Sequence, residues 1–162
     1  MLRFLIYGLL GWCGEIVWTA GYDALSGTTR APGDTVGRVP LGRAERLRLS
    51  GRTYLWMLPI YGLAAFLFEP AHDAIRALPW PARGAIWAAG IFAVEYAAGW
   101  LLARLTGRCP WDYSYARASV GGYIRLDYAP VWFCVGLLLE RVHDVLRVLQ
   151  SIEEPLRKAF LT

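Results

Sequence analysis

The chain has 162 residues, of which 56% are hydrophobic and eight are tryptophan, so it is more apolar and more aromatic than an ordinary soluble domain. Its net charge of +4 comes from 17 basic against 13 acidic residues. The arginines lie between long apolar segments and accompany no nucleic-acid-binding motif, which favours contacts with lipid phosphates and argues against a nucleic-acid partner. Three cysteines without a CxxC pair argue against a disulfide framework.

The first predicted element is a membrane-spanning helix at 4–22. The apolar run extends from Leu2 past Trp18 and no small-residue cleavage site follows it, so we expect a retained span and not a signal peptide. Its four glycines weaken a helix in water but permit close helix approach in lipid. The N-terminal segment therefore predicts a packed helix of a membrane bundle.

The next segment, at about 23–52, is rich in arginine, glycine and proline. This composition predicts an exposed or headgroup-bound loop that contributes little to the core, with a short surface helix around 41–49. We treat the whole chain, 1–162, as one membrane domain that carries this Arg-rich loop and a C-terminal tail at about 150–162.

Three further spans are predicted at 53–69, 84–106 and 129–149. The second is interrupted by Pro59 and Gly62, and the last becomes charged in its second half while an apolar stripe continues. The predicted fold is all-α: a polytopic integral membrane bundle of four transmembrane helices in the cell membrane. The prolines around 70–81 leave open a fifth, re-entrant or interfacial segment.

Three glutamates lie inside these predicted spans. Glu15, Glu95 and Glu140 are each about 11 residues from a span entry, roughly 16 Å deep and near the middle of a ~30 Å hydrocarbon layer. A carboxylate at that depth must be protonated, paired or exposed to a water-filled cavity. Either the three share a cavity that binds a cation, a proton or a lipid headgroup, or each is hydrogen-bonded separately. No basic residue lies at the depth of Glu95, which favours a proton or an external cation there.

A polar and aromatic loop follows the third span. Trp111, Asp112, Tyr113 and Ser114 are explained either by interface anchoring and a turn cap or by a loop that folds back over the carboxylates. Both explanations stay open. Tyr61, in the interrupted second span, is a further candidate for the same site.

Two His–Asp pairs, at 72–73 and 143–144, stand beside Glu69 and Glu140. With two histidines in the chain and no HExxH spacing, we predict no metal site and no cofactor, and interpret both pairs as solvated helix ends. The sequence contains no phosphate-binding P-loop and no nucleophile elbow. Any ATP hydrolysis would therefore come from a partner ATPase, and whether the chain is itself an enzyme is left open.

An ordered set of motifs resembles a known family: GWCGE at 11–15, PIYG at 59–62, VEYAAG at 94–99, CPWDYS at 109–114, and Pro130 followed by Trp132-Phe133. The pattern is similar to the small bacterial membrane family labelled "putative ABC-transporter type IV", and more closely to its relatives of the vertebrate transmembrane protein 229 type. The resemblance implies a polytopic α-helical membrane protein with a transport role. The Arg-rich stretch at about 27–50 departs from the pattern as an insertion.

Three classes of function follow. The first is a permease-like or ion- or proton-coupled transport component with a mid-membrane carboxylate site. The second is a membrane-embedded enzyme or lipid-headgroup-binding protein, and the third is a structural or regulatory subunit of a membrane complex. The expected partners are the lipid bilayer and other membrane subunits or an ATPase, and an oligomer is compatible with each class. The candidate binding or proton-site residues are Glu15, Glu95, Glu140, Tyr61, Trp111, Asp112, Tyr113 and Ser114.

Overall fold

The structure, a computed structural model, describes the backbone of residues 1–31 and 37–161 and the side chains up to residue 151, apart from 32–36. Residues 32–36, within the predicted Arg-rich loop, lie outside the described residues. The predicted C-terminal tail is described as backbone only from residue 152, up to 161.

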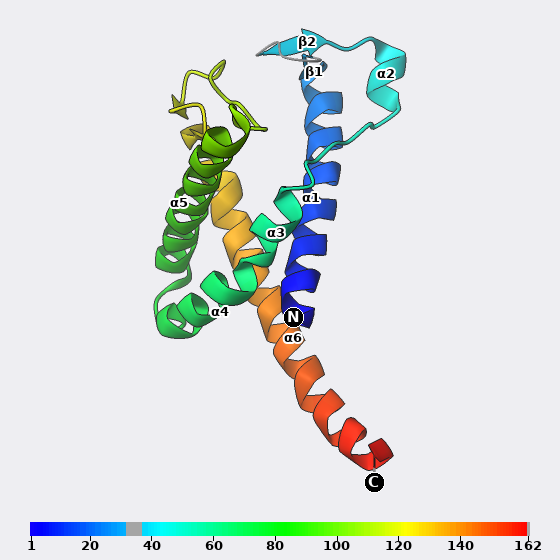
Figure 1. The fold of residues 1–162 in the computed structure, drawn as a ribbon, viewed down its shortest axis with the longest axis vertical. Coiled ribbons are helices and arrows are strands. Elements are labelled where there is room, and N and C mark those ends of the chain that lie inside the picture. Colours follow the sequence, from blue (N-terminus) through cyan, green and yellow to red (C-terminus); the bar gives the residue numbers. More distant parts are fainter. Residues whose placement is uncertain (32–36, 162) are drawn as a thin grey trace.

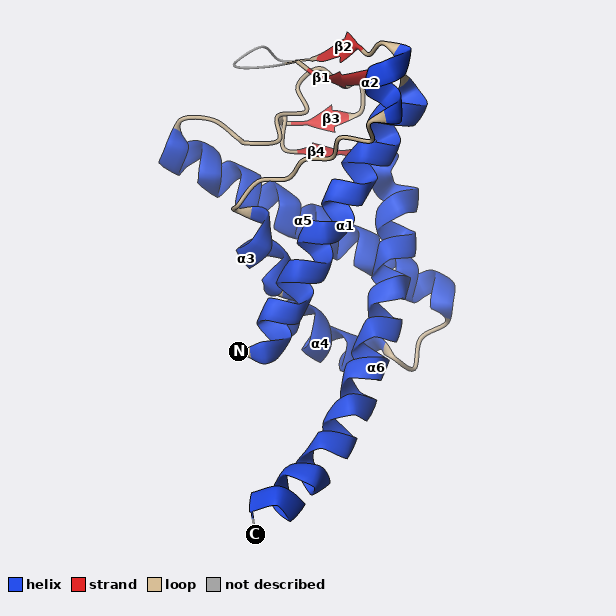
Figure 2. Ribbon diagram, turned by 90° about the vertical axis from the view of Figure 1, so that its right-hand side faces the viewer, coloured by secondary structure: helices blue, strands red, loops and turns tan. Residues whose placement is uncertain are grey.

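The chain is mostly helical, as predicted. Three long helices form its frame: α1 (Leu2–Ser26), α5 (Trp80–Thr106) and α6 (Ala129–Leu161). A shorter helical stretch, α3 (Met57–Gly62) followed by α4 (Ala64–Ile75), crosses between α1 and the α5–α6 pair (Figure 1). Helix α6 runs on below the other elements toward the C-terminus (Figures 1 and 2).

Two of the described helices, α1 and α5, are long and apolar enough to cross a membrane. Only 11% of the most apolar window of α1 and 17% of that of α5 is buried inside the protein. A core helix of a soluble protein would be mostly buried, whereas large side chains such as Val17 and Leu105 point outward here. This arrangement fits helices whose outer faces contact lipid.

The second predicted span differs from the observed elements at both ends. Residues 53–56 are not helical, the helix breaks at Leu63, and α4 continues through Pro70 to Ile75. The predicted end of this span at residue 69 is therefore wrong, because the helix continues through Pro70. Helix α5 also begins earlier than predicted, because Pro81 occupies its first turn, where a missing N–H costs nothing.

Glycines set the two main helix pairings, α1 with α3 and α5 with α6. A Cβ atom at Gly11 would collide with the ring of Tyr61, and one at Gly136 would collide with Trp87. At both positions the absence of a side chain lets an aromatic residue of the neighbouring helix approach the backbone. The small residues noted in the sequence thus act as contact points of the bundle.

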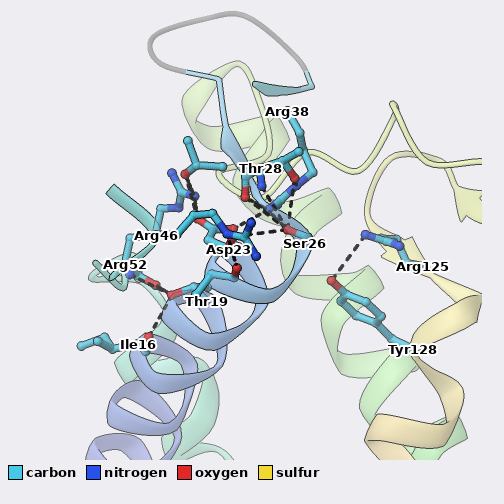
Figure 3. Close-up of polar contacts among 12 residues, drawn as sticks. Ile16, Thr19, Asp23, Ser26, Thr28, Arg38, Arg46, Arg52, Arg125 and Tyr128 are labelled. Atoms are coloured by element: carbon cyan, nitrogen blue, oxygen red, sulfur yellow. Dashed lines mark hydrogen bonds and ion pairs between the residues drawn. The ribbon is translucent and has the colours of Figure 1, made fainter. Parts of the chain in front are cut away.

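The Arg-rich loop contains two short strands that the sequence did not predict. Strands β1 (Thr28–Arg30) and β2 (Arg38–Pro40) pair antiparallel, and α2 (Arg43–Leu47) lies within the predicted surface helix and has no buried residue. Asp23 at the end of α1 accepts hydrogen bonds from Arg38 and Arg52 (Figure 3). The loop is therefore tied to α1 by buried charge.

The connection between α5 and α6 folds back onto the bundle. It contains the antiparallel strands β3 (Ser119–Val120) and β4 (Ile124–Arg125) and a 3₁₀ turn, η1 (Leu126–Tyr128). Between β3 and β4, Gly121 and Gly122 adopt φ angles of 62° and 78°, a conformation that glycine adopts without strain. Cys109 and Trp111 from this connection join a buried apolar cluster with Met57 and Leu102.

Candidate functional site

Glu15 of α1 faces the non-helical segment before α3 and α3 itself. Its Oε2 accepts hydrogen bonds from the Thr53 hydroxyl at 2.6 Å and from the Tyr61 hydroxyl at 3.3 Å. Thr53 was not among the sequence candidates, because only the packing of this segment against α1 brings it to the carboxyl. The described side-chain contacts of Glu15 are thus with neutral hydroxyls.

Glu95 of α5 faces Tyr113 of the folded-back connection and Trp132 of α6. One carboxyl oxygen, Oε2, is buried without a hydrogen-bond partner among the described residues, and so is the indole Nε1 of Trp132. These two groups are close to one another but do not meet in a good hydrogen bond. Burial of polar atoms without hydrogen-bond partners is costly, so these two groups are candidates for a functional role.

The two carboxyls belong to one cluster. Glu15 and Glu95 lie within electrostatic range of each other, and Tyr61 and Tyr113 each lie within range of both. We call these four residues the carboxyl–tyrosine cluster. It joins α1, α3, α5 and the connection after α5, and within the described part of the chain neither carboxyl contacts a lysine or an arginine.

The connection that carries Trp111 and Tyr113 covers this cluster. Trp111 is buried and its Nε1 donates to the Tyr123 carbonyl at 3.1 Å, while the Tyr113 amide donates to the Gly122 carbonyl at 2.8 Å. Asp112 instead accepts from the backbone amide and the hydroxyl of Ser114, at 2.8 and 2.6 Å. Trp111 and Tyr113 therefore fit the folded-back loop, whereas Asp112 and Ser114 fit the turn cap.

The structure separates Glu140 from this cluster. Its carboxylate accepts hydrogen bonds from Arg83 at 2.9 and 3.1 Å and from Trp87 at 2.8 Å. Arg83 lies about 18 Å along α5 from Glu95. The prediction that all three carboxyls lie at one depth is therefore wrong. The reason is how α6 is positioned along α5. Trp132, near the start of α6, is already beside Glu95. Later residues of α6, such as Glu140, therefore lie beside the start of α5.

A charged layer surrounds Glu140 at this end of the bundle. Arg3 contacts Glu69 at 2.6 Å, Arg76 contacts Asp144 at 2.6 Å, and Arg147 contacts Asp73 at 3.0 Å. These pairs link α1, α4 and α6 and suit a membrane–water boundary.

The two histidines lie inside this layer. His72 is 1% exposed and His143 is 2% exposed, so our interpretation of solvated helix ends is wrong for both. A signal was present for His72: it follows Phe68 by one helical turn and stacks on its ring.

A comparison with known protein families finds a match for most of the chain. A family model described as "Putative ABC-transporter type IV" matches residues 38–162, which include Tyr61, Glu95 and the connection with Trp111 and Tyr113. Glu15 precedes the matched range. No solved structure matches the chain significantly. With more than half of its length matched, the chain belongs to the family described as "Putative ABC-transporter type IV".

Proposed function

We propose that the protein is a small integral membrane component of a transport system, and that it binds a proton or a monovalent cation between Glu15 and Glu95. The proposed bundle has four spans, formed by α1, α3 with α4, α5, and α6. Family membership and the outward-facing apolar surfaces of α1 and α5 support a membrane protein related to transport.

The observation that carries the proposal is the carboxyl–tyrosine cluster itself. Along α1, Glu15 lies about 18 Å from Arg3 and about 12 Å from Asp23. The distance of ~30 Å between these two charged ends matches the thickness of the hydrocarbon core of a bilayer. A carboxyl at that depth is expensive and marks an ion or proton pathway more often than a structural contact. Here two carboxyls from different helices lie within electrostatic range of each other.

The chemistry of the cluster suits a single positive charge. Two neighbouring carboxyls in a low-dielectric site disfavour two simultaneous negative charges, so one proton or one small cation bound between them is favoured. Tyr61 and Thr53 supply hydroxyl oxygens beside Glu15, and oxygen donors are what hard cations prefer. Energy for transport would come from an ion gradient or from a partner ATPase, because the sequence has no P-loop.

The test uses the full-length protein in proteoliposomes. A carbodiimide that reacts with protonated carboxyls in apolar surroundings should label Glu15 or Glu95, as read by peptide mass spectrometry, and should label Glu140 far less. A pH-sensitive dye inside the vesicles should report proton or cation-coupled flux under an imposed membrane potential. Glu15→Gln and Glu95→Gln should abolish the flux.

Glu45→Gln is the matched control, because Glu45 lies on the exposed helix α2 and accepts from the Gly42 amide. This variant should behave as the wild type. The proposal fails if neither Glu15 nor Glu95 is labelled, or if wild-type vesicles conduct no faster than empty ones under every cation tested.

A second candidate function, lipid-headgroup binding, is favoured by a cavity of about 200 Å³ at the Asp23 end of α1. Asp23, Thr29, Glu45, Arg46 and Arg48 line it. Paired acidic and basic groups suit a zwitterionic phospholipid headgroup. Native mass spectrometry would distinguish the two: a phospholipid retained by the wild type and lost from Arg48→Ala would support headgroup binding.

A further inference from the structure

The charged layer contains a second constellation that the transport site does not use. His72 and Asp73 of α4 lie opposite His143 of α6. The Asp73 Oδ1 atom is 3.7 Å from His72 Nδ1 and 3.9 Å from His143 Nε2, and one donor atom from each residue fits within 4.8 Å of the others. Three side chains of types that bind metal ions therefore approach one another from two helices.

The ring nitrogens that converge are the unpartnered ones. His72 Nδ1 and His143 Nε2 are both buried and have no hydrogen-bond partner among the described residues. The separations of 3.7 and 3.9 Å from Asp73 are too long for hydrogen bonds. Two buried imidazoles thus each leave one nitrogen near the same carboxylate and able to bind a ligand.

The opposite nitrogen of His143 is held by a carboxylate. Glu69 Oε1 lies 3.4 Å from His143 Nδ1, with the Tyr7 hydroxyl at 3.5 Å and Arg3 Nη1 at 3.4 Å. Arg3 has closer partners in Glu69 and Gln150. A proton on Nδ1 that faces Glu69 leaves the Nε2 lone pair free, which is the carboxylate–histidine arrangement found behind metal ligands.

The charged neighbours of His72 and Asp73 are compatible with binding of an ion by these two residues. His72 Nε2 lies 3.3 Å from Arg76 Nη1, but the exposed Arg76 is held more closely by Asp144 at 2.6 Å. Arg147 contacts both oxygens of Asp73, at 3.0 and 3.4 Å. Binding of an ion by Oδ1 requires Arg147 to give up its 3.0 Å bond to that oxygen, while its 3.4 Å contact with Oδ2 can stay.

We propose that His72, Asp73 and His143 bind a divalent transition-metal ion such as Zn²⁺, which joins α4 to α6. Two neutral imidazoles and one carboxylate form a nitrogen- and oxygen-donor set that zinc and its neighbours accept and that magnesium and calcium do not favour. Bonds of about 2.0–2.2 Å require the three donor atoms to close toward one another by a small side-chain movement. Three protein ligands leave a coordination position open for water or a fourth group.

The experiment uses full-length protein in detergent with a purification tag free of histidine, stripped with a chelator. Cys13→Ser and Cys134→Ser are present throughout, because both thiols are exposed. Titration with Zn²⁺ by calorimetry should give one ion per chain and raise the thermal unfolding midpoint. Co²⁺ should give the visible absorption of a four-coordinate nitrogen- and oxygen-ligated ion.

Variants locate the ion. His72→Gln, His143→Gln and Asp73→Asn should each weaken zinc binding at least tenfold, and Glu69→Gln should weaken it about 10- to 100-fold through the ring of His143. Asp127→Asn is the matched control: it removes a carboxylate that pairs with an arginine, Arg125, away from this layer, and should leave the affinity unchanged.

Circular dichroism and gel filtration show which variants keep the fold. The site is refuted if the stripped wild type binds no zinc saturably, or if a folded Asp73→Asn or Glu69→Gln variant binds it as tightly as the wild type. Failure here leaves the transport proposal untouched, since Glu15 and Glu95 belong to another part of the bundle.

Discussion

Glu140 and the Glu15–Glu95 pair look alike in the sequence and are treated oppositely by the fold. Glu140 receives two hydrogen bonds from Arg83 and one from Trp87, so its negative charge is matched by a fixed positive one. Glu15 and Glu95 instead face neutral hydroxyls and an indole. The partner, and not the depth counted along the chain, therefore decides whether the charge of a buried carboxyl is matched within the protein.

The same contrast holds for whole layers of the molecule. Both ends of α1 carry ion pairs, with Arg3 on Glu69 at one end and Asp23 between Arg38 and Arg52 at the other. The central layer holds the carboxyl–tyrosine cluster without an arginine among the described contacts of its carboxyls. Charge is thus neutralised by ion pairs at the ends, whereas the described contacts of the central carboxyls are with neutral groups.

Breaking the Glu140 pair should have the largest effect on stability. Glu140→Ala leaves Arg83, whose side chain is 20% exposed, and the Trp87 indole without their acceptor. We expect a loss of about 3 kcal/mol in the free energy of unfolding, measured by denaturant titration in detergent. The double variant Glu140→Leu with Arg83→Leu should recover most of it. An unchanged single variant would show that the pair is not a structural anchor.

A matched pair of glycines tests the α1–α3 contact that holds Tyr61 beside Glu15. Gly11→Ala forces a methyl group into the ring of Tyr61 and should cost about 1–3 kcal/mol. Gly14→Ala, with open space around its Cβ position, should be neutral or stabilising by up to about 1 kcal/mol. Thermal unfolding midpoints of both variants compare them. Equal midpoints would mean that α3 does not pack on α1 as described.

Neutral substitutions in the cluster sharpen the contrast with Glu140. Glu15→Gln and Glu95→Gln keep an acceptor oxygen for the neighbouring hydroxyls and remove the mutual repulsion of the carboxyls. The free energy of unfolding should therefore stay within about 1 kcal/mol of the wild type or rise, even though flux is lost. A loss as large as that of Glu140→Ala would indicate a buried ion pair at this site as well.

The smallest effect is expected from the ion pair between Arg125, which is buried in β4, and Asp127, which is exposed in η1. The Arg125 guanidinium hydrogen-bonds Asp127 at 2.5 Å and lowers the pKa of that carboxyl. A lowered folded-state pKa contributes stability above the ordinary value, near pH 4, that is lost as pH falls through the lowered one.

Because Asp127 is 45% exposed, solvent screening keeps this contribution below about 1 kcal/mol. Asp127→Asn removes this contribution. Between about pH 5 and pH 2, the unfolding midpoint of the variant should therefore fall slightly less than that of the wild type. A fall as steep as in the wild type would assign the acid sensitivity to other carboxyls.

Much of the frame followed from local sequence. Apolar runs of membrane length define α1 and α5, because a helix must bury its backbone polar groups within itself and present apolar side chains to lipid. Proline at the start of α5 and glycines at helix contacts also act locally. The sequence also identified candidate site residues, because polar and aromatic groups in or beside such apolar runs require an explanation. They are Glu15, Glu95, Tyr61, Trp111 and Tyr113.

The tertiary structure alone decided which of these residues meet. Residue counting measures distance along one helix and leaves the relative levels of α5 and α6 undetermined, so the pairing of Glu140 with Arg83 was not foreseeable. Thr53 reaches Glu15, and His72 reaches His143, through contacts between elements far apart in the chain. A site built from several helices depends on how they pack, and packing is set by the sum of many side-chain contacts that no single segment contains.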